Sequence, residues 1–349
     1  MKRIMYISTI RSPLSDEEIR AIGQVASRNN KQVGVTGILI AVHDFFFQIL
    51  EGDESTLDRL VEKIRQDRRH KDLKVLNAES DIAERMFPIW NMRTIRLDEA
   101  NGVILQAIRM MLQNITQSHR VIERYTQPSV LKFLEAGINP LTVPVKKTEK
   151  IVLFADIVGF SYLADKFPVE EVAEVVNIYL ETCSTLIVRH GGEVAKYVGD
   201  CVIAYFPPDG ADAAIAACLD ALLEFVELRK DAERCRLLKF LYGGFGLSAG
   251  TVIEGNFGSS IKLDYTSLGG TVNIAARLES LTREVGRAIA MSERIRRNAG
   301  NDWSFEDLGE FTLKGQEQPA RVYSLADPVV RDFKNHQILC QDMQQFCEI

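Results

Sequence analysis

Strand and helix patterns alternate in a fixed order over the first hundred residues, and this order restricts the folds that the segment can adopt. Residues 3–9 alternate as a strand, and a capping box of Ser15 and Glu18 precedes a helix with one apolar face. Two apolar strands, a second amphipathic helix and a last strand follow at residues 36–42, 45–50, 57–64 and 73–78. The order βαββαβ predicts a ferredoxin-like α+β domain with two helices on one face of its sheet.

In the second half of the chain, two aspartates each end a short apolar strand. Asp156 closes the run 151–155, and Asp200 follows a glycine that suits a tight hairpin. Two carboxylates side by side provide the oxygen ligands that Mg²⁺ and Mn²⁺ prefer, and they leave coordination positions for phosphates. Asn273 and Arg277 lie four residues apart, on one face of a predicted helix. One such aspartate alone is more often a turn or cap residue, but the set predicts a two-metal nucleotide site.

Composition sets limits on the class of protein. The 349 residues support about two domains, and the 46% of hydrophobic residues argue against disorder. We find no apolar run of 18 residues and no N-terminal secretion signal, and the net charge of −6 argues against a nucleic-acid surface. The six cysteines form no C-x-x-C pair and the five histidines show no ligand spacing. We therefore expect a cytoplasmic protein with reduced thiols, without zinc, membrane or nucleic-acid partners.

The stretch from about residue 149 to 326 carries FADIVGF, KYVGDCV, GTVIEGNFG, VNIAARLE and LKG in this order. It resembles the catalytic domain of class III nucleotidyl cyclases, whose antiparallel-rich sheet is flanked by helices. The resemblance implies conversion of ATP to 3′,5′-cyclic AMP and pyrophosphate, with metal binding by Asp156, Ile157 and Asp200. It also implies that Asn273 orients the ribose and that Arg277 stabilises charge on the transferring phosphoryl group.

Three further positions match substrate contacts of that family. Lys196 and Thr266 match the pair that reads the purine edge, and this pair favours adenine over guanine. Lys314, in LKG, matches a lysine that contacts the polyphosphate, although it could also be an ordinary solvated lysine before a turn. The family site is normally shared by two subunits, which implies a homodimer.

Two positions depart from the cyclase pattern. Many members carry arginine where this chain has Thr251, so one phosphate contact is absent or supplied elsewhere. Many also read LGD where this chain reads LGG, with Gly270 in place of the aspartate. The missing carboxylate loosens the start of the following helix. Both departures predict weakened activity at most.

The N-terminal segment carries Tyr6, Asn30, FFFQILEG with Gln48, DRRH at residues 67–70, and MFPIW followed by N and M. These pieces resemble a BLUF domain, the flavin-binding blue-light sensor. The resemblance implies that Tyr6 donates an electron to the excited flavin and that the Gln48 amide, which has donors and an acceptor, rearranges after light. The implied contacts to FAD or FMN are Tyr6, Ile22, Asn30, Phe46, Gln48, Arg69, His70, Trp90 and Met92; whether Trp90 or Met92 faces the flavin stays open.

Apolar residues recur with helical spacing between the two segments. They predict a connecting helix over residues 103–124, which either forms a dimer seam or packs on the sensor sheet; we favour the seam. The predicted domains are a sensor at 1–100, a connecting helix and linker at 101–147, a catalytic domain at 148–326 and a tail at 327–349. The tail has an amphipathic pattern and no role that its sequence reveals.

Together these features predict a homodimeric, light-activated adenylyl cyclase that uses a flavin and Mg²⁺ or Mn²⁺. Two other functions stay open. The catalytic domain could be degenerate and bind only nucleotide, or the enzyme could be a guanylyl cyclase, against which Lys196 and Thr266 speak.

Overall fold

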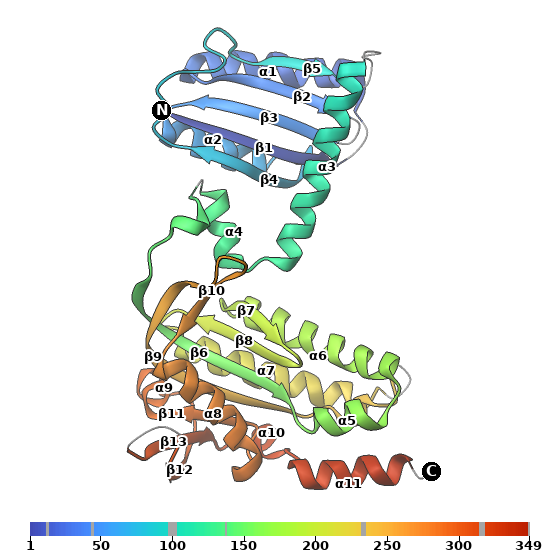
Figure 1. Ribbon diagram of the computed structural model, residues 1–349, viewed down its shortest axis with the longest axis vertical. Coiled ribbons are helices and arrows are strands. Elements are labelled where there is room, and N and C mark those ends of the chain that lie inside the picture. The colour runs from blue at the N-terminus through green and yellow to red at the C-terminus, as the bar shows by residue number, and fades with distance from the viewer. Residues whose placement is uncertain are drawn as a thin grey trace. The chain divides into compact units, whose positions relative to one another are not determined.

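The structure is a computed structural model that describes residues 1–11, 14–42, 45–96, 103–136, 138–231, 235–313 and 318–347. The chain divides into two compact units, Met1–Val143 and Pro144–Ile349, and each has its own sheet and its own apolar core (Figure 1).

The first unit is built on a five-stranded sheet in the order β4-β1-β3-β2-β5. Its strands are β1 (Lys2–Ile10), β2 (Thr36–Val42), β3 (Phe45–Gly52), β4 (His70–Glu79) and β5 (Arg93–Arg96). Helices α1 (Asp16–Val33) and α2 (Glu54–Arg65) cover one face of this sheet (Figure 1). The ferredoxin-like prediction is confirmed, as is the capping box of Ser15 and Glu18 at the start of α1. The sequence pattern missed only the short β5, which pairs parallel to β2.

Strand β3 shows how the sheet separates its two faces. Successive side chains of a strand point to opposite faces. Phe46 and Leu50 belong to the core beneath α1 and α2, whereas Phe47 and Ile49 belong to a cluster on the other face. Gln48 therefore points toward the two helices from the middle of an apolar strand.

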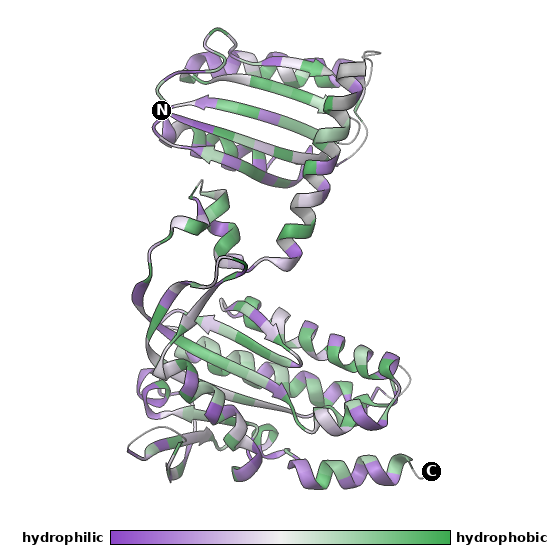
Figure 2. Cartoon of the chain, viewed as in Figure 1, coloured by the Kyte–Doolittle hydropathy of each residue, from purple (hydrophilic) through white to green (hydrophobic). Residues whose placement is uncertain are grey.

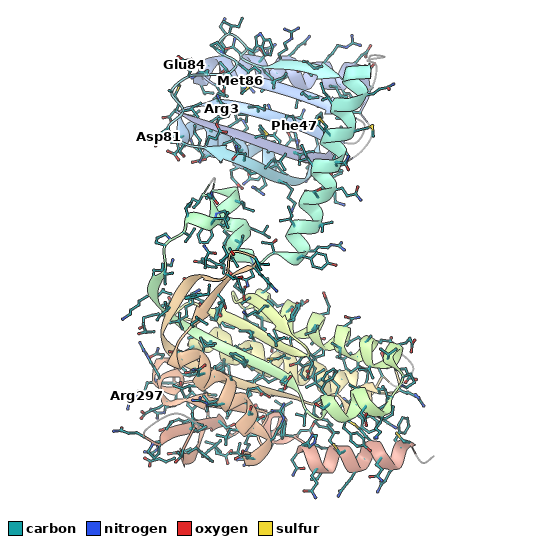
Figure 3. The ribbon with its side chains drawn as sticks, viewed as in Figure 1. Arg3, Phe47, Asp81, Glu84, Met86 and Arg297 are labelled. Atoms are coloured by element: carbon teal, nitrogen blue, oxygen red, sulfur yellow. The ribbon has the colours of Figure 1, made fainter. Side chains whose placement is uncertain are left out.

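The predicted connecting helix is α3 (Val103–Tyr125), followed by α4 (Pro128–Glu135) and the short η1 (Pro140–Thr142). One residue of its apolar stripe, Leu112, packs on the sheet face that carries Phe47, which Figure 3 labels beside α3. Four others keep 36–63% of their surface exposed, namely Ile108, Met111, Ile115 and Ile122. The helix thus contacts the sheet through Leu112, while neighbouring residues of the same apolar stripe stay exposed.

The second unit contains an eight-stranded sheet in the order β12-β13-β11-β9-β6-β8-β7, with β10 paired to β9. The strands are β6 (Lys146–Ile157), β7 (Glu193–Val198), β8 (Cys201–Phe206), β9 (Gly243–Gly258), β10 (Leu263–Leu268), β11 (Ile289–Ser292), β12 (Phe305–Phe311) and β13 (Ala320–Leu325). The helices are α5 (Phe160–Lys166), α6 (Val169–Arg189), α7 (Ala211–Leu228), η2 (Leu238–Phe240), α8 (Gly270–Val285), α9 (Glu293–Asn298), α10 (Pro328–Arg331) and α11 (His336–Cys347). Most strand pairs are antiparallel, as expected; β11 and β9 run parallel.

Strand β6 lies near the middle of this sheet and is drawn in hydrophobic colours along much of its length (Figure 2). Ile151 and Leu153 join the large core with α6 and α7, while Val152 and Phe154 join a cluster on the opposite face with residues of α8. By the same alternation Asp156 points to the α8 face. Helix α8 comes close to the sheet because β9 carries Gly246, where an added Cβ would lie 2.2 Å from the carbonyl oxygen of Ala275.

The residues predicted as a tail pack into the large core of the second unit. Val330, Leu339 and Met343 are fully buried in the cluster that contains α6 and α7. A Cβ placed at Gly159, just after the strand that ends in Asp156 and Ile157, would lie 3.4 Å from Leu339 and 3.6 Å from Met343. Helix α11 thus packs directly on the turn that follows Asp156.

Candidate functional site

The first unit contains a cavity of about 490 Å³ between its sheet and helices α1 and α2. Six of the nine residues predicted to contact flavin line it, namely Tyr6, Ile22, Asn30, Gln48, Arg69 and His70. The cavity also explains two exposed apolar side chains of α1, Val25 and Val33, since both line it. A pocket of this size and mixed lining falls in the range of small-molecule and cofactor sites.

A chain of hydrogen bonds crosses the inner wall of the cavity. The Tyr6 hydroxyl donates to Oε1 of Gln48, and Nε2 of Gln48 donates to Sδ of Met92 at 3.2 Å. Tyr6 and Gln48 are directly opposite each other in the β1–β3 register. Tyr6 is completely buried, and this burial raises the pKa of its hydroxyl, which keeps it a neutral donor.

Charged and polar groups lie at the other end of the cavity. The Arg69 guanidinium holds the Asp67 carboxylate through bonds of 2.5–3.1 Å and lowers the pKa of Asp67 to about 2. Burial lowers the pKa of His70 to about 4, and Nδ1 of His70 lies 2.7 Å from the hydroxyl of Ser8. Ser8 carries no motif, so sequence reasoning could not have found this partner.

Three predicted flavin contacts do not line the cavity. Phe46 is buried behind it, with its ring centroid 5.1 Å from that of His70. Met92 belongs to the core on the cavity side of the sheet, where its sulfur accepts a hydrogen bond from Gln48. Trp90 lies on the other face of the sheet, stacked on Phe87 at 5.3 Å. Of the two alternatives left open by the sequence, Met92 faces the cavity side and Trp90 does not.

The segment before Met92 is anchored to β3 by a buried carboxylate. Glu51 accepts hydrogen bonds from the backbone N–H groups of Met86 at 2.8 Å and Phe87 at 2.9 Å, and from Arg3 at 2.7 Å. Arg3 and Met86 are labelled in Figure 3. Because Glu51 is three residues after Gln48, the strand that carries the amide also holds the segment that carries its sulfur partner.

The donor set fits a flavin. Apolar side chains such as Ile22 and Leu39 can pack against a flat aromatic ring, and the Asn30 and Gln48 amides can bond its polar edge. The cationic side chains of Arg59 and Lys63 on α2 also line the cavity, where they suit the phosphate end of such a molecule.

In the second unit, Asp156 and Asp200 lie at adjacent strand ends. Asp200 occupies the two-residue turn between β7 and β8, which Gly199 permits with a φ of 65°. Oδ2 of Asp200 accepts the N–H of Ile157 at 3.2 Å. Burial, with the neighbouring Asp156 carboxylate as a second cause, raises the pKa of Asp200 to about 7. The three predicted metal ligands are therefore brought together, and a divalent cation would relieve the repulsion between the carboxylates.

Two charged residues of α8 join this group, and neither was predicted as a site residue: Glu279 ends the VNIAARLE motif, and Arg283 lies outside it. Arg283 donates to Oδ2 of Asp156 at 2.8 Å, and its other terminal nitrogen lies 2.8 Å from Oε1 of Glu279. Burial raises the pKa of Glu279 to about 7. The i, i+4 spacing of Glu279 and Arg283 is visible in the sequence, but only the strand register shows that Arg283 reaches Asp156. Across the described part of the chain, no cluster of three or more acidic, histidine or cysteine side chains suits a metal.

The predicted purine-reading residues lie together on β7 and β10. Nζ of Lys196 donates to Oδ2 of Asp264 at 2.6 Å, and Thr266 is two residues further along β10, on the same face. Asp264 was not predicted. Its carboxylate directs the Lys196 ammonium toward β10, the strand that carries Thr266.

Asn273 and Arg277 lie in the first two turns of α8. Arg277 and Arg283 are six residues apart, which places them about 120° apart around the helix axis. The α8 face that holds Arg283 against Asp156 is therefore not the face that carries Arg277. Among the described residues, no hydrogen bond or ion pair links Asp156 or Asp200 to Asn273 or Arg277.

The remaining predicted positions have different outcomes. Lys314 lies outside the described residues. The Thr251 hydroxyl donates to Glu149, which also accepts from Arg294 at 2.5 Å, so an arginine does lie near this position. A Cβ at Gly270 would meet no atom within 4 Å, and α8 starts without a side-chain cap.

Comparison with known families matches both units. The family described as "Adenylate and Guanylate cyclase catalytic domain" matches residues 143–327, and the family "BLUF: Sensors of blue-light using FAD" matches residues 1–93. The chain belongs to the adenylate and guanylate cyclase family and carries a BLUF domain. Both resemblances drawn from the motifs are confirmed.

Similar proteins are described as photoactivated or light-regulated adenylate cyclases. A photoactivated adenylate cyclase subunit beta of Euglena longa is 33% identical over 299 residues, and a subunit alpha of Euglena gracilis is 34% identical over 295. Each alignment covers 84% of this chain but only 34% and 29% of the relative, so the chain spans about a third of the curated relatives it matches. A solved bacterial light-regulated adenylyl cyclase is 43% identical, with a TM-score of 0.90 over 99% of both chains. No helix in the described ranges of this cyclase-family chain has the length and apolarity to cross a membrane.

Proposed function

We propose that the chain is a blue-light-activated adenylyl cyclase that converts ATP to 3′,5′-cyclic AMP and pyrophosphate. The observation that carries the proposal is that one chain contains both the Tyr6–Gln48 cavity and the Asp156–Asp200 pair. The bacterial light-regulated adenylyl cyclase that resembles this chain along 99% of its length supports it.

In the sensor, FAD is the proposed flavin, in agreement with the description of the BLUF family. Tyr6 and Gln48 would adjoin its ring, and Met92 accepts from the same amide. If the amide reverses after light, Nε2 no longer faces the sulfur of Met92, so the bond that joins β3 to the segment before β5 changes. A tenfold change in rate needs only about 1.4 kcal/mol of differential stabilisation, which a change of one hydrogen bond can supply.

In the catalytic unit, Asp156, Ile157 and Asp200 would hold Mg²⁺ or Mn²⁺. Such a cation pair, when bound, activates the 3′-hydroxyl and neutralises the triphosphate. Lys196 and Thr266 would read the adenine edge, with Lys196 directed by Asp264. Asn273 would orient the ribose, and the Arg277 guanidinium would stabilise charge on the phosphoryl group.

We further propose that the active enzyme is a homodimer with two shared sites. Because Arg277 and Arg283 lie on different faces of α8, a chain that directs Arg283 to its own Asp156 directs Arg277 elsewhere. A second copy would supply Asn273 and Arg277 to the metal-binding aspartates. The exposed apolar stripe of α3 is a suitable surface for the dimer interface, since it presents apolar side chains to solvent.

The test is cyclic AMP formation from ATP and Mg²⁺ by the purified protein, in darkness and under blue light, with Asp156→Ala as the control. We expect flavin absorbance and a light-dependent product that the control lacks. Equal rates in darkness and light would remove the regulatory part of the proposal. No product with either Mg²⁺ or Mn²⁺ would favour a degenerate domain, and faster turnover of GTP would favour a guanylyl cyclase.

A further inference from the structure

The ion pair between Arg283 and Asp156 is the observation that carries this inference. One guanidinium spans two carboxylates: Nη2 bonds Asp156 at 2.8 Å and Nη1 lies 2.8 Å from Glu279. The side chains are only partly accessible, with 24% of Arg283, 26% of Asp156 and 7% of Glu279 exposed. Such a shielded pair is screened less by water than a surface ion pair.

The fold fixes this contact from three directions. Alternation along β6 turns Asp156 toward α8, and the i, i+4 spacing places Glu279 beside Arg283. The close approach of α8 to Gly246 leaves little room for the helix to shift, since a Cβ there would lie 2.2 Å from the backbone nitrogen of Glu279. Arg283 is therefore held at Asp156 by the architecture of the unit.

The charges make this contact a competitor for a metal ion. Asp156 and Asp200 repel each other, and Arg283 is the cation that bonds Asp156. Arginine keeps its charge at any ordinary pH, so the pair cannot be relieved by loss of a proton. A divalent cation bound to Asp156 would face that guanidinium at the same carboxylate, and repulsion between the two positive charges would oppose binding.

We propose that Arg283 is a positioning residue that acts as the counter-ion of Asp156 in the metal-free enzyme and competes with the divalent cation for this carboxylate. The inference rests on the proposed function, because it takes Asp156 and Asp200 as the metal ligands. Arg283 stabilises the empty site and sets the metal concentration at which the site fills. Glu279 shares the guanidinium and so weakens its hold on Asp156.

The experiment measures Mn²⁺ binding without nucleotide, by the electron paramagnetic resonance signal of free Mn²⁺, on the full-length protein in darkness. The variants are Arg283→Gln, Arg283→Lys, Glu279→Gln and Asp156→Asn. Arg287→Gln is the matched control, since Arg287 forms a similar pair with Glu306 at 2.9 Å, four residues further along the chain. Thermal unfolding in a chelator and at saturating Mn²⁺ is the second readout.

We expect Arg283→Gln to bind Mn²⁺ about tenfold more tightly and Glu279→Gln to bind it several-fold more weakly, with Arg283→Lys between wild type and Arg283→Gln. In chelator, Arg283→Gln should unfold at a lower temperature than wild type, and saturating Mn²⁺ should close this gap. The control Arg287→Gln should bind Mn²⁺ like wild type.

Two results would overturn the inference in different ways. Unchanged or weaker Mn²⁺ binding by Arg283→Gln, while Asp156→Asn loses binding, would mean that Arg283 does not compete although the metal site is correct. Full binding by Asp156→Asn would overturn the metal assignment itself, and the inference with it. Glu279→Gln tests the same competition in the opposite direction, so the question stays decidable if Arg283→Gln does not fold.

Discussion

The two units of this chain assemble their sites in different ways. In the sensor unit, Tyr6, Asn30, Gln48 and His70 come from separate elements and line one cavity. In the catalytic unit, the Asp156–Asp200 pair and the Lys196–Asp264 pair are separate groups, and α8 turns Arg277 away from the aspartates. A buried cofactor site can be complete within one small fold, whereas a site for a large, charged substrate can be divided between two copies of a chain.

The largest expected effect tests whether the catalytic site is divided. Asp156→Asn and Arg277→Ala should each lower cyclic AMP formation by about 10³-fold or more, about 4 kcal/mol of barrier. In a homodimer of either variant, both shared sites lack one residue that they need. An equimolar mixture that exchanges subunits should recover about a quarter of wild-type activity, since half of the dimers carry one intact site of two. A mixture as inactive as its parents would contradict a site shared in this way.

The next effect tests whether the C-terminal helix belongs to the catalytic unit. Leu339→Ala should destabilise that unit by about 2–5 kcal/mol, because Leu339 is fully buried in its core. The matched control is Ile338→Ala, since Ile338 is 47% exposed and should change stability by less than about 0.5 kcal/mol. Denaturant unfolding followed by far-UV circular dichroism measures both, and equal losses would place α11 outside the core.

A pH effect should appear in the sensor unit. The pKa of His70 is about 4 in the folded protein and about 6.5 when unfolded. The unfolded chain therefore binds more protons between these values, so stability is full above pH 6.5 and falls by at most about 3 kcal/mol as pH falls to 4. Flavin-monitored unfolding of wild type and His70→Gln measures this. The same slope in both proteins would assign it to another group.

Removal of one hydroxyl should separate flavin binding from the light response. Tyr6→Phe preserves the shape of a fully buried ring but leaves Oε1 of Gln48 without its donor, at a loss of about 1–3 kcal/mol of stability. The variant should stay yellow, and its cyclic AMP production should be equal in darkness and light. A preserved light response would show that Tyr6 is only a packing residue.

The smallest effect concerns the helix that carries Asn273. Gly270→Asp restores a carboxylate at the first position of α8, in a place where its Cβ meets no atom within 4 Å. We expect a gain of about 0.3–1 kcal/mol from the helix dipole and activity raised by no more than a few-fold. Gly270→Asn is the control, because it has the same shape without the charge. Loss of activity in both variants would show that a side chain itself is not tolerated there.

The sequence by itself determined the two families and most of the elements of the first unit, apart from the short β5. The apolar runs of β3 and β6, the Ser15–Glu18 capping box and the glycine before Asp200 are local signals, because strand formation, helix caps and tight hairpins depend on neighbouring residues. The motifs, through the two resemblances, predicted Tyr6 and Gln48 at one flavin and Asp156 and Asp200 at one metal site.

Only the tertiary structure decided which face each side chain occupies and what it meets there. Trp90 and Met92 are two residues apart, yet they belong to clusters on opposite faces of the sheet. Ser8 and Arg283 belong to no motif. Ser8 contacts His70, which is 62 residues away in sequence, and Arg283 contacts Asp156, which is 127 residues away. Such contacts depend on strand register and on how closely a helix approaches its sheet, which arise from packing across the whole unit and leave no local pattern.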